Sequence, residues 1–299
     1  MGKRKNSFYN TDDGWGGNWT ERKLNAFCKY VKSYLMIMKE HPHWETIYFD
    51  GFAGSGDRKI EEQSDLYKQL KLTEDEQQGY RGAAQRVIEI DSSLKFNFYY
   101  FADTDKESLA HLERKLKALP AAEGKELIFR PGDANHWIQQ LGNAMRSNKY
   151  AALVFLDPFG MQIDWMTIES LKDTRSDLWI LIPTGVIVNR MLDHKCELIY
   201  SNKLTAFLGI TEEEIKKTFY TLSTQTTLFG DQTETNKKVS GSINKIADVY
   251  VNKLKTVFKY VTERPLRLDT PNGTPLFHFI FASNNRTALK IAKEIIQNI

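Results

Sequence analysis

Five short apolar segments alternate with helical patterns between residues 46 and 183, and this alternation limits the possible folds more than any other feature. Runs rich in β-branched and aromatic residues predict strands over 46–50, 96–103, 126–133, 151–160 and 176–183. Apolar residues at helical spacing predict helices over 80–90, 106–119, 134–146 and 165–172. Strands separated by helices form a parallel sheet whose two faces are both covered.

The C-terminal part predicts a different arrangement. Two strand patterns, 258–266 and 274–283, flank the turn sequence Asp-Thr-Pro-Asn-Gly, which indicates an antiparallel hairpin, and a last helix begins near Arg286. A mostly parallel sheet closed by such a hairpin resembles the class I methyltransferases. We therefore expect an α/β, Rossmann-like class I methyltransferase fold.

The chain divides into four parts on this interpretation. Residues 1–45 form a polar, glycine-rich arm followed by an amphipathic helix, with Thr20 as its N-cap. Residues 46–183 form the methyltransferase core, which contains a charged insertion over 57–79. Residues 184–256 are expected to be a helical insertion with a mobile Thr/Gln/Asn-rich loop. Residues 257–299, the hairpin and the last helix, complete the core.

Composition excludes some classes of protein and leaves others open. Hydrophobic residues make up 41% of the 299 residues, which is too many for a disordered chain. Apolar runs are too short for a membrane span, no secretory leader is recognisable, and two cysteines suggest neither a disulfide scaffold nor a metal cluster. We expect a cytoplasmic protein with no membrane association. A net charge of +3 permits a nucleic-acid partner without indicating one.

A glycine-rich loop, Asp50-Gly-Phe-Ala-Gly-Ser-Gly56, follows the first predicted strand. It lacks the Lys-Ser/Thr of phosphate-binding loops and the spacing of dinucleotide-binding loops. Small residues let the backbone approach a ligand, and Asp50 suits a cationic amine, such as the methionyl end of S-adenosylmethionine. The alternative is a tight turn without function. As cofactor-binding residues we therefore predict the loop positions Asp50, Phe52, Ala53, Gly54, Ser55 and Gly56.

Acidic residues also close the next three predicted strands. Asp103, followed by Thr104, could accept hydrogen bonds from ribose hydroxyls. Asp105 is a less favoured alternative, because it lies where the next helix needs an N-cap. Asp133, followed by Ala134, could accept from the adenine amine or cap its own helix. We count Asp103, Thr104, Asp133 and Ala134 among the predicted cofactor-binding residues.

The fourth strand ends in the sequence Asp157-Pro158-Phe159-Gly160. Pro158 fixes the turn and lacks a backbone donor, so the Asp157 carboxyl and nearby carbonyls can accept hydrogen bonds from a planar exocyclic amine. Phe159 can stack on the base that carries this amine. Asp157, Pro158 and Phe159 are the predicted catalytic residues; the alternative is an Asp-Pro turn with a core phenylalanine.

The motif Phe-Ala-Gly-Ser-Gly with Asp-Pro-Phe-Gly resembles nucleic-acid amino-methyltransferases, although these usually carry [Asn/Asp]-Pro-Pro-[Tyr/Phe]; tRNA guanine N2-dimethyltransferases carry Asp-Pro-Phe-Gly. Over most of 19–299 the chain is similar to the three-Cys-motif partner proteins, TcmP. That resemblance includes the helix of 21–38, YFDGFAGSG, FADTD, GDAN, FLDPFG and FHFIFAS. It implies a methyltransferase domain and a partner protein with a three-cysteine motif, and it supplies no substrate.

Two functions agree with these observations. The first is an S-adenosylmethionine-dependent methyltransferase that acts on an exocyclic amine, of a nucleic-acid base or nucleoside. The second is a non-catalytic subunit that binds S-adenosylmethionine or nucleic acid for the three-Cys partner. Intact Asp50, Asp103 and Asp157 favour the enzyme.

Overall fold

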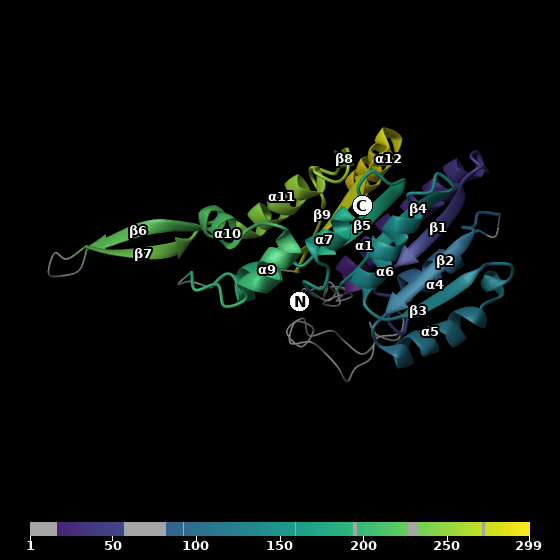
Figure 1. Ribbon diagram of the computed structural model, residues 1–299, viewed down its shortest axis with the longest axis horizontal. Coiled ribbons are helices and arrows are strands. Elements are labelled where there is room, and N and C mark those ends of the chain that lie inside the picture. The colour runs from purple at the N-terminus through teal and green to yellow at the C-terminus, as the bar shows by residue number, and fades with distance from the viewer. Residues whose placement is uncertain are drawn as a thin grey trace, which may run out of the picture.

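A computed structural model describes residues 17–56, 82–91, 93–158, 160–193, 196–226, 232–270 and 273–299 (Figure 1). In this part of the chain, an eight-stranded sheet has the order β3-β2-β1-β4-β5-β10-β8, with β9 also paired to β10. Five strands are parallel: β1 (Glu45–Asp50), β2 (Phe98–Asp103), β3 (Leu127–Pro131), β4 (Tyr150–Leu156) and β5 (Ser176–Ile182). Antiparallel to β5 runs β10 (Pro275–Ser283), and antiparallel to β10 run β8 (Tyr260–Val261) and β9 (Leu266–Asp269).

This strand order confirms the predicted fold. The parallel strands run 3-2-1-4-5 across the sheet, and the last strand is inserted antiparallel between the fifth strand and the shorter β8 and β9. That is the sheet of a Rossmann-like class I methyltransferase. The hairpin differs in one detail, because its first strand is interrupted between β8 and β9. There the Thr262 hydroxyl donates to the carbonyl of Phe281 and accepts from its N–H, and Pro265 has no N–H for a ladder.

Helices cover both faces of the sheet, each with its own hydrophobic core (Figure 1). One core includes α6 (Ala134–Ala144), α7 (Trp165–Glu169), α9 (Ser201–Leu208) and α11 (Ser242–Leu254). The other includes α1 (Gly17–Lys39), α4 (Ala83–Ile88), α5 (Lys106–Lys117) and α12 (Arg286–Gln297). The remaining helical segments are η1 (Pro120–Ala122), α8 (Thr184–Val186), η2 (Ile187–Met191) and α10 (Glu212–Phe219). None of the helices described is both long and apolar enough to cross a membrane.

The first helix lies on an aromatic face of the sheet. Phe27 stacks on Phe155 of β4 at a ring-centroid distance of 4.2 Å, and Trp19 stacks on Phe277 of β10 at 5.1 Å. The prediction of Thr20 as the N-cap is wrong, because the helix already includes Gly17 and Thr20 is buried within it. Trp19, which immediately precedes the predicted N-cap, contacts Phe277, and this tertiary contact stabilises the first turn.

The segment predicted as a mobile loop within a helical insertion is instead a β-hairpin. Strands β6 (Tyr220–Thr226) and β7 (Gln232–Lys238) pair antiparallel in register from Tyr220 opposite Lys238 to Thr226 opposite Gln232. Figure 1 shows this hairpin extending beyond α10, away from the large sheet. Threonine is β-branched and favours the extended backbone, which explains why a polar segment without apolar periodicity forms strands. Residues 1–16 of the predicted arm over 1–19, and the whole of the predicted insertion over 57–79, lie outside the described residues.

Candidate functional site

The glycine loop lies where β1 ends and is attached to the two neighbouring strands. The N–H of Gly51 donates to the carbonyl of Phe155 on β4 at 3.1 Å, and the N–H of Ala53 donates to Ala102 on β2 at 3.0 Å. Gly54 has a φ of +58°, and a Cβ placed on it would meet no atom within 4 Å. The backbone at this position therefore favours glycine, and the loop leaves open space beside it.

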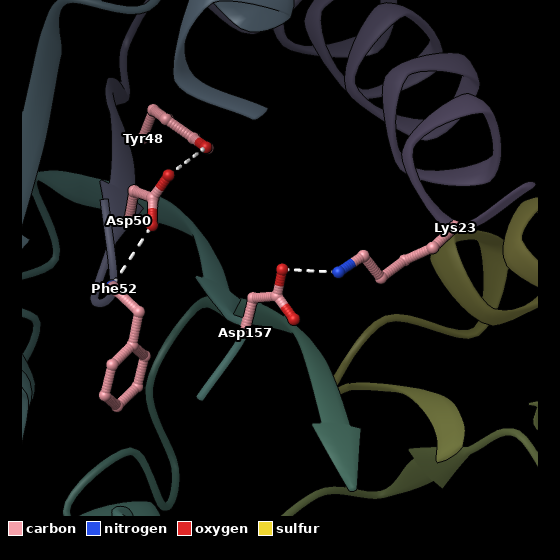
Figure 2. A network of polar contacts seen from close by, with 5 residues as sticks. All are labelled: Lys23, Tyr48, Asp50, Phe52 and Asp157. Carbon is pink, nitrogen blue, oxygen red and sulfur yellow. Dashed lines mark hydrogen bonds and ion pairs between the residues drawn. The ribbon is translucent and has the colours of Figure 1, made fainter. Parts of the chain in front are cut away.

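Asp50 is the buried acidic group of this loop, with 2% of its surface exposed. Its carboxylate accepts from the N–H of Phe52 at 3.2 Å and from the hydroxyl of Tyr48 at 3.2 Å (Figure 2). Burial raises the pKa of Asp50 from 3.8 to about 7; the charge of Asp157 also raises it, and the two hydrogen bonds lower it. Within the described residues, no cation pairs with Asp50.

Asp103, at the end of β2, holds the glycine loop. One of its carboxylate oxygens accepts from the N–H of Gly54 at 2.8 Å, and the other accepts from the N–H of Asp105 at 2.9 Å. Each oxygen keeps a second lone pair for a ligand. Asp105 caps α5 by accepting from Glu107 and Ser108, as expected, and Thr104 between the two aspartates is exposed.

Asp133 is the N-cap of α6, one of the two roles considered for it. Its Oδ1 accepts both the N–H and the side-chain amide of Asn135, at 2.9 and 3.0 Å. Ala134 is buried beside the glycine loop: a Cβ placed on Gly51 would lie 3.6 Å from the Cβ of Ala134. The start of α6 thus lies against the loop that follows β1, and a role of Asp133 toward adenine stays a prediction.

Asp157 follows β4 directly and forms an ion pair with Lys23 of α1 (Figure 2). The Lys23 side chain is 4% exposed and the Asp157 side chain 21%. The Lys23 ammonium bonds to Oδ2 of Asp157, while Oδ1 has no donor among the described residues. Pro158 is buried, and Phe159 lies outside the described residues.

Lys23 reaches Asp157 because of the packing between α1 and β4. Phe27 stacks on Phe155, and Lys23 precedes Phe27 by four residues, which is one helical turn on the same face. Asp157 follows Phe155 by two residues, which is the same side of a strand. The ring of Trp19 lies 5.6 Å from the Lys23 ammonium and adds a cation–π contact.

Asn135, like Lys23, was not predicted from the sequence to be part of the site. Its side-chain carbonyl accepts from the N–H of Asp164 at 2.9 Å and from the hydroxyl of Thr167 at 2.8 Å, and its amide donates to the carbonyl of Gln162 at 2.8 Å. These bonds tie the segment after Asp157 to the start of α6. The Asn in the sequence Gly-Asp-Ala-Asn was the only signal for it.

Three carboxylates therefore share the carboxyl edge of the sheet: Asp50 ends β1, Asp103 ends β2, and Asp157 directly follows β4. Asp103 organises the loop backbone, Asp157 is compensated by Lys23, and Asp50 is buried with no compensating cation from the described part of the chain. A ligand with a cationic amine and a pair of hydroxyls matches Asp50, Asp103 and the open space at Gly54. S-adenosylmethionine carries both kinds of group, so the residues present fit this cofactor.

Comparisons with known proteins leave the reaction open. No family model and no curated protein matches the chain. The solved structure of protein LPL1258 from Legionella pneumophila is 12% identical, covers 88% of this chain and 97% of its own, and has a TM-score of 0.37. Spermidine synthase from Thermotoga maritima is 10% identical, over 91% of this chain and 62% of that one, with a TM-score of 0.41. A spermidine synthase bound to the transition state analogue AdoDATO is also 10% identical, covers 92% of this chain and 62% of its own, and has a TM-score of 0.38. The chain thus spans less than two thirds of the synthases' length, and its function must be argued from the site.

Proposed function

We propose that the protein is an S-adenosylmethionine-dependent methyltransferase that methylates an exocyclic amine of a nucleic-acid base or nucleoside. The observation that carries this proposal is the meeting of Asp50, Asp103 and Asp157 with an open glycine loop at one edge of a methyltransferase-type sheet. Ligands of such sheets bind outside the carboxyl ends of the strands.

Each group of the cofactor has a counterpart in this chain. Asp50 would face the cationic methionyl end, Gly54 would allow close approach, and Asp103 would accept hydrogen bonds from the ribose hydroxyls. Oδ2 of Asp133 has no donor in the described part of the chain and could accept from the adenine amine. When bound, S-adenosylmethionine supplies a methyl group that is already activated for transfer, so the protein contributes mainly positioning.

Asp157 would position the substrate. Lys23 holds Oδ2, which fixes the carboxylate and leaves Oδ1 to accept an N–H of the substrate amine. A hydrogen bond at one N–H fixes the direction of the nitrogen lone pair, which is the geometry that methyl transfer needs. The proposal assigns Phe159 to stacking on the base, at about 1–3 kcal/mol for a base–aromatic contact.

The partner forms a separate part of the proposal. The motif resemblance to the three-Cys-motif partner proteins supports an assembly with a protein that carries a three-cysteine motif. Such a partner could deliver a nucleic-acid substrate, which would be consistent with the modest net charge of +3 on this chain. Co-purification of the two proteins from the native host tests this part independently of catalysis.

A second candidate is a subunit that binds S-adenosylmethionine without transferring its methyl group. The ion pair of Lys23 with Asp157 favours it, because the carboxylate expected to bind an amine already has a buried cationic partner. The two candidates differ in what Asp157 is for. In the enzyme it contacts the substrate, whereas in the subunit it only attaches α1 to the sheet.

Nucleoside mass spectrometry separates the candidates. Total nucleosides from cells with and without the gene would identify a missing methylated species. The deletion strain is then complemented with the parent, with Asp157→Ala and, as a control, with Asp105→Asn, at matched protein levels. For the enzyme, Asp157→Ala should fail to restore the modification although the purified variant still binds S-adenosylmethionine in calorimetry, whereas Asp105→Asn, which keeps the helix cap, should restore it. Full restoration by Asp157→Ala would overturn the catalytic role and leave the non-catalytic subunit.

A further inference from the structure

A cavity of about 280 Å³ lies between α1 and α12, away from the site described above. Among its lining residues are Tyr30, Tyr34 and Met38 of α1, Asp177 of β5, and Ala288 and Ile291 of α12. Asp177 is the second residue of β5, at the amino end of the parallel strands, whereas the candidate site lies at their carboxyl ends. The volume approaches the lower range of sites for small organic molecules.

Asp177 is the acidic group of this cavity, which the polar residues His41, Asn285 and Thr287 also line. Its two carboxylate oxygens accept from the hydroxyl of Tyr30 at 2.6 Å and from the hydroxyl of Ser283 at 2.5 Å. Burial raises the pKa of Asp177 to about 6, and both hydrogen bonds lower it. No cation of the described chain pairs with it. The nearby guanidinium of Arg175 instead lies over the ring of Trp44, 4.1 Å from its centroid.

Tyr34, another lining residue, carries a hydroxyl that the described structure leaves unsatisfied. It is buried and has no hydrogen-bond partner within the described residues. A buried hydroxyl without a partner costs free energy, so a group that enters the cavity and bonds to it gains more than it would at a satisfied site. Apolar side chains, among them Met38, Ala288 and Ile291, form much of the remaining wall.

We propose that this cavity binds a small aliphatic ammonium compound, with the ammonium at Asp177 and Tyr34 and the alkyl body against Met38, Ala288 and Ile291. A cation compensates the Asp177 carboxylate, to which the described chain supplies none, and the ammonium group can donate to the Tyr34 hydroxyl, which is unpaired among the same residues. An anion is the main competing occupant, because the N-terminal end of α12, capped by Asn285, also borders the cavity and attracts negative charge.

Calorimetry with three matched probes tests this proposal on the full chain. Pentylammonium, 1-pentanol and pentanoate have similar alkyl bodies and differ in charge. We expect pentylammonium to bind at least tenfold more tightly than either of the others. Asp177→Asn should reduce that preference below threefold. Tyr34→Phe removes only a hydroxyl without a partner, keeps the fold, and should weaken pentylammonium threefold to tenfold.

Two further variants locate the binding. Ala288→Leu fills the cavity and should weaken pentylammonium and pentanol alike, by tenfold or more. Asp50→Asn controls for an amine that binds at the other buried carboxylate and should leave the affinity unchanged. Equal affinity for pentylammonium and pentanol, or loss of binding in Asp50→Asn with retention in Tyr34→Phe, would overturn the proposal. So would tighter binding of pentanoate, or no heat signal from any probe, which would leave a water-filled cavity.

Discussion

Replacing Asp50 with Asn should make the protein more stable above pH 7 and leave its stability near pH 4 unchanged. Burial raises the pKa of Asp50 from 3.8 to about 7, so the unfolded chain releases this proton at a lower pH than the folded chain does. Between these two values, a rise in pH therefore favours the unfolded state. The displacement is about three pKa units at about 1.4 kcal/mol each, which gives a cost on the order of 4 kcal/mol at pH 8.

Asn is nearly isosteric and removes this cost. Its carbonyl can still accept from the N–H of Phe52, and its amide can donate to the hydroxyl of Tyr48, so both hydrogen bonds of Asp50 have replacements. Urea unfolding at pH 4, 6 and 8 measures the difference between variant and parent, in which the titration of other groups cancels. Asp133→Asn is the matched control, because Asp133 is exposed and Asn caps a helix about as well as Asp.

The same carboxylate should couple cofactor binding to pH. A cationic ligand beside Asp50 favours the ionised form, so binding of S-adenosylmethionine should release a proton near pH 7, and affinity should rise from pH 5 to 7 and then level off. Calorimetry in two buffers of different ionisation enthalpy counts the proton. If the difference in unfolding free energy between Asp50→Asn and the parent does not depend on pH, Asp50 is not a buried, uncompensated carboxylate. If S-adenosylmethionine binds tightly without releasing a proton, Asp50 does not contact the cofactor.

Three other perturbations test the remaining parts of the site. Gly54→Asn keeps a residue that tolerates positive φ but fills the open space, so it should abolish S-adenosylmethionine binding, while Gly124→Asn, at a φ of +69° in a similarly open position, should not. Asp103→Ala should weaken the cofactor by about 1.5–3 kcal/mol in calorimetry, the scale of bonds to a charged group; Asp105→Ala should change affinity much less and cost about 1 kcal/mol of stability through its lost cap. Lys23→Met leaves the partly buried Asp157 carboxylate unpaired and should lower the free energy of unfolding, measured in urea, by about 3 kcal/mol. The double variant Lys23→Met with Asp157→Asn should largely recover this loss.

Much of the fold could be predicted because its signals are local. The parallel strands are nearly continuous in buried residues; β4, for example, is buried from Ala151 to Leu156. The β6–β7 hairpin carries no such signal, since it forms a separate two-stranded sheet and has little apolar periodicity. Its polar, Thr-rich sequence is compatible with a loop as well as with a strand. The two are distinguished only by the antiparallel pairing, which runs from Tyr220 opposite Lys238 to Thr226 opposite Gln232.

The acidic residues of the candidate site were also predictable, for a geometric reason. Carboxyl ends of parallel strands meet at one edge of a sheet, so Asp50, Asp103 and Asp157 had to lie near one another once the strands were identified. Lys23 was not predictable in this way. Its position depends on how α1 crosses the sheet, which is set by tertiary contacts such as the stack of Phe27 on Phe155.

Lys23 decides which of the three carboxylates can best bind a cationic ligand. Three carboxylates at one edge repel one another, and the charge of Asp157 contributes to the raised pKa of Asp50. The only buried ammonium that the described chain places at this edge goes to Asp157 and not to the more buried Asp50. Lys23 therefore holds Asp157 as a fixed, charged acceptor, while no cation of the described chain compensates the ionised form of Asp50. A cationic ligand at this edge gains most by binding at Asp50, and the compensated Asp157 is left to a neutral polar group such as an amine N–H.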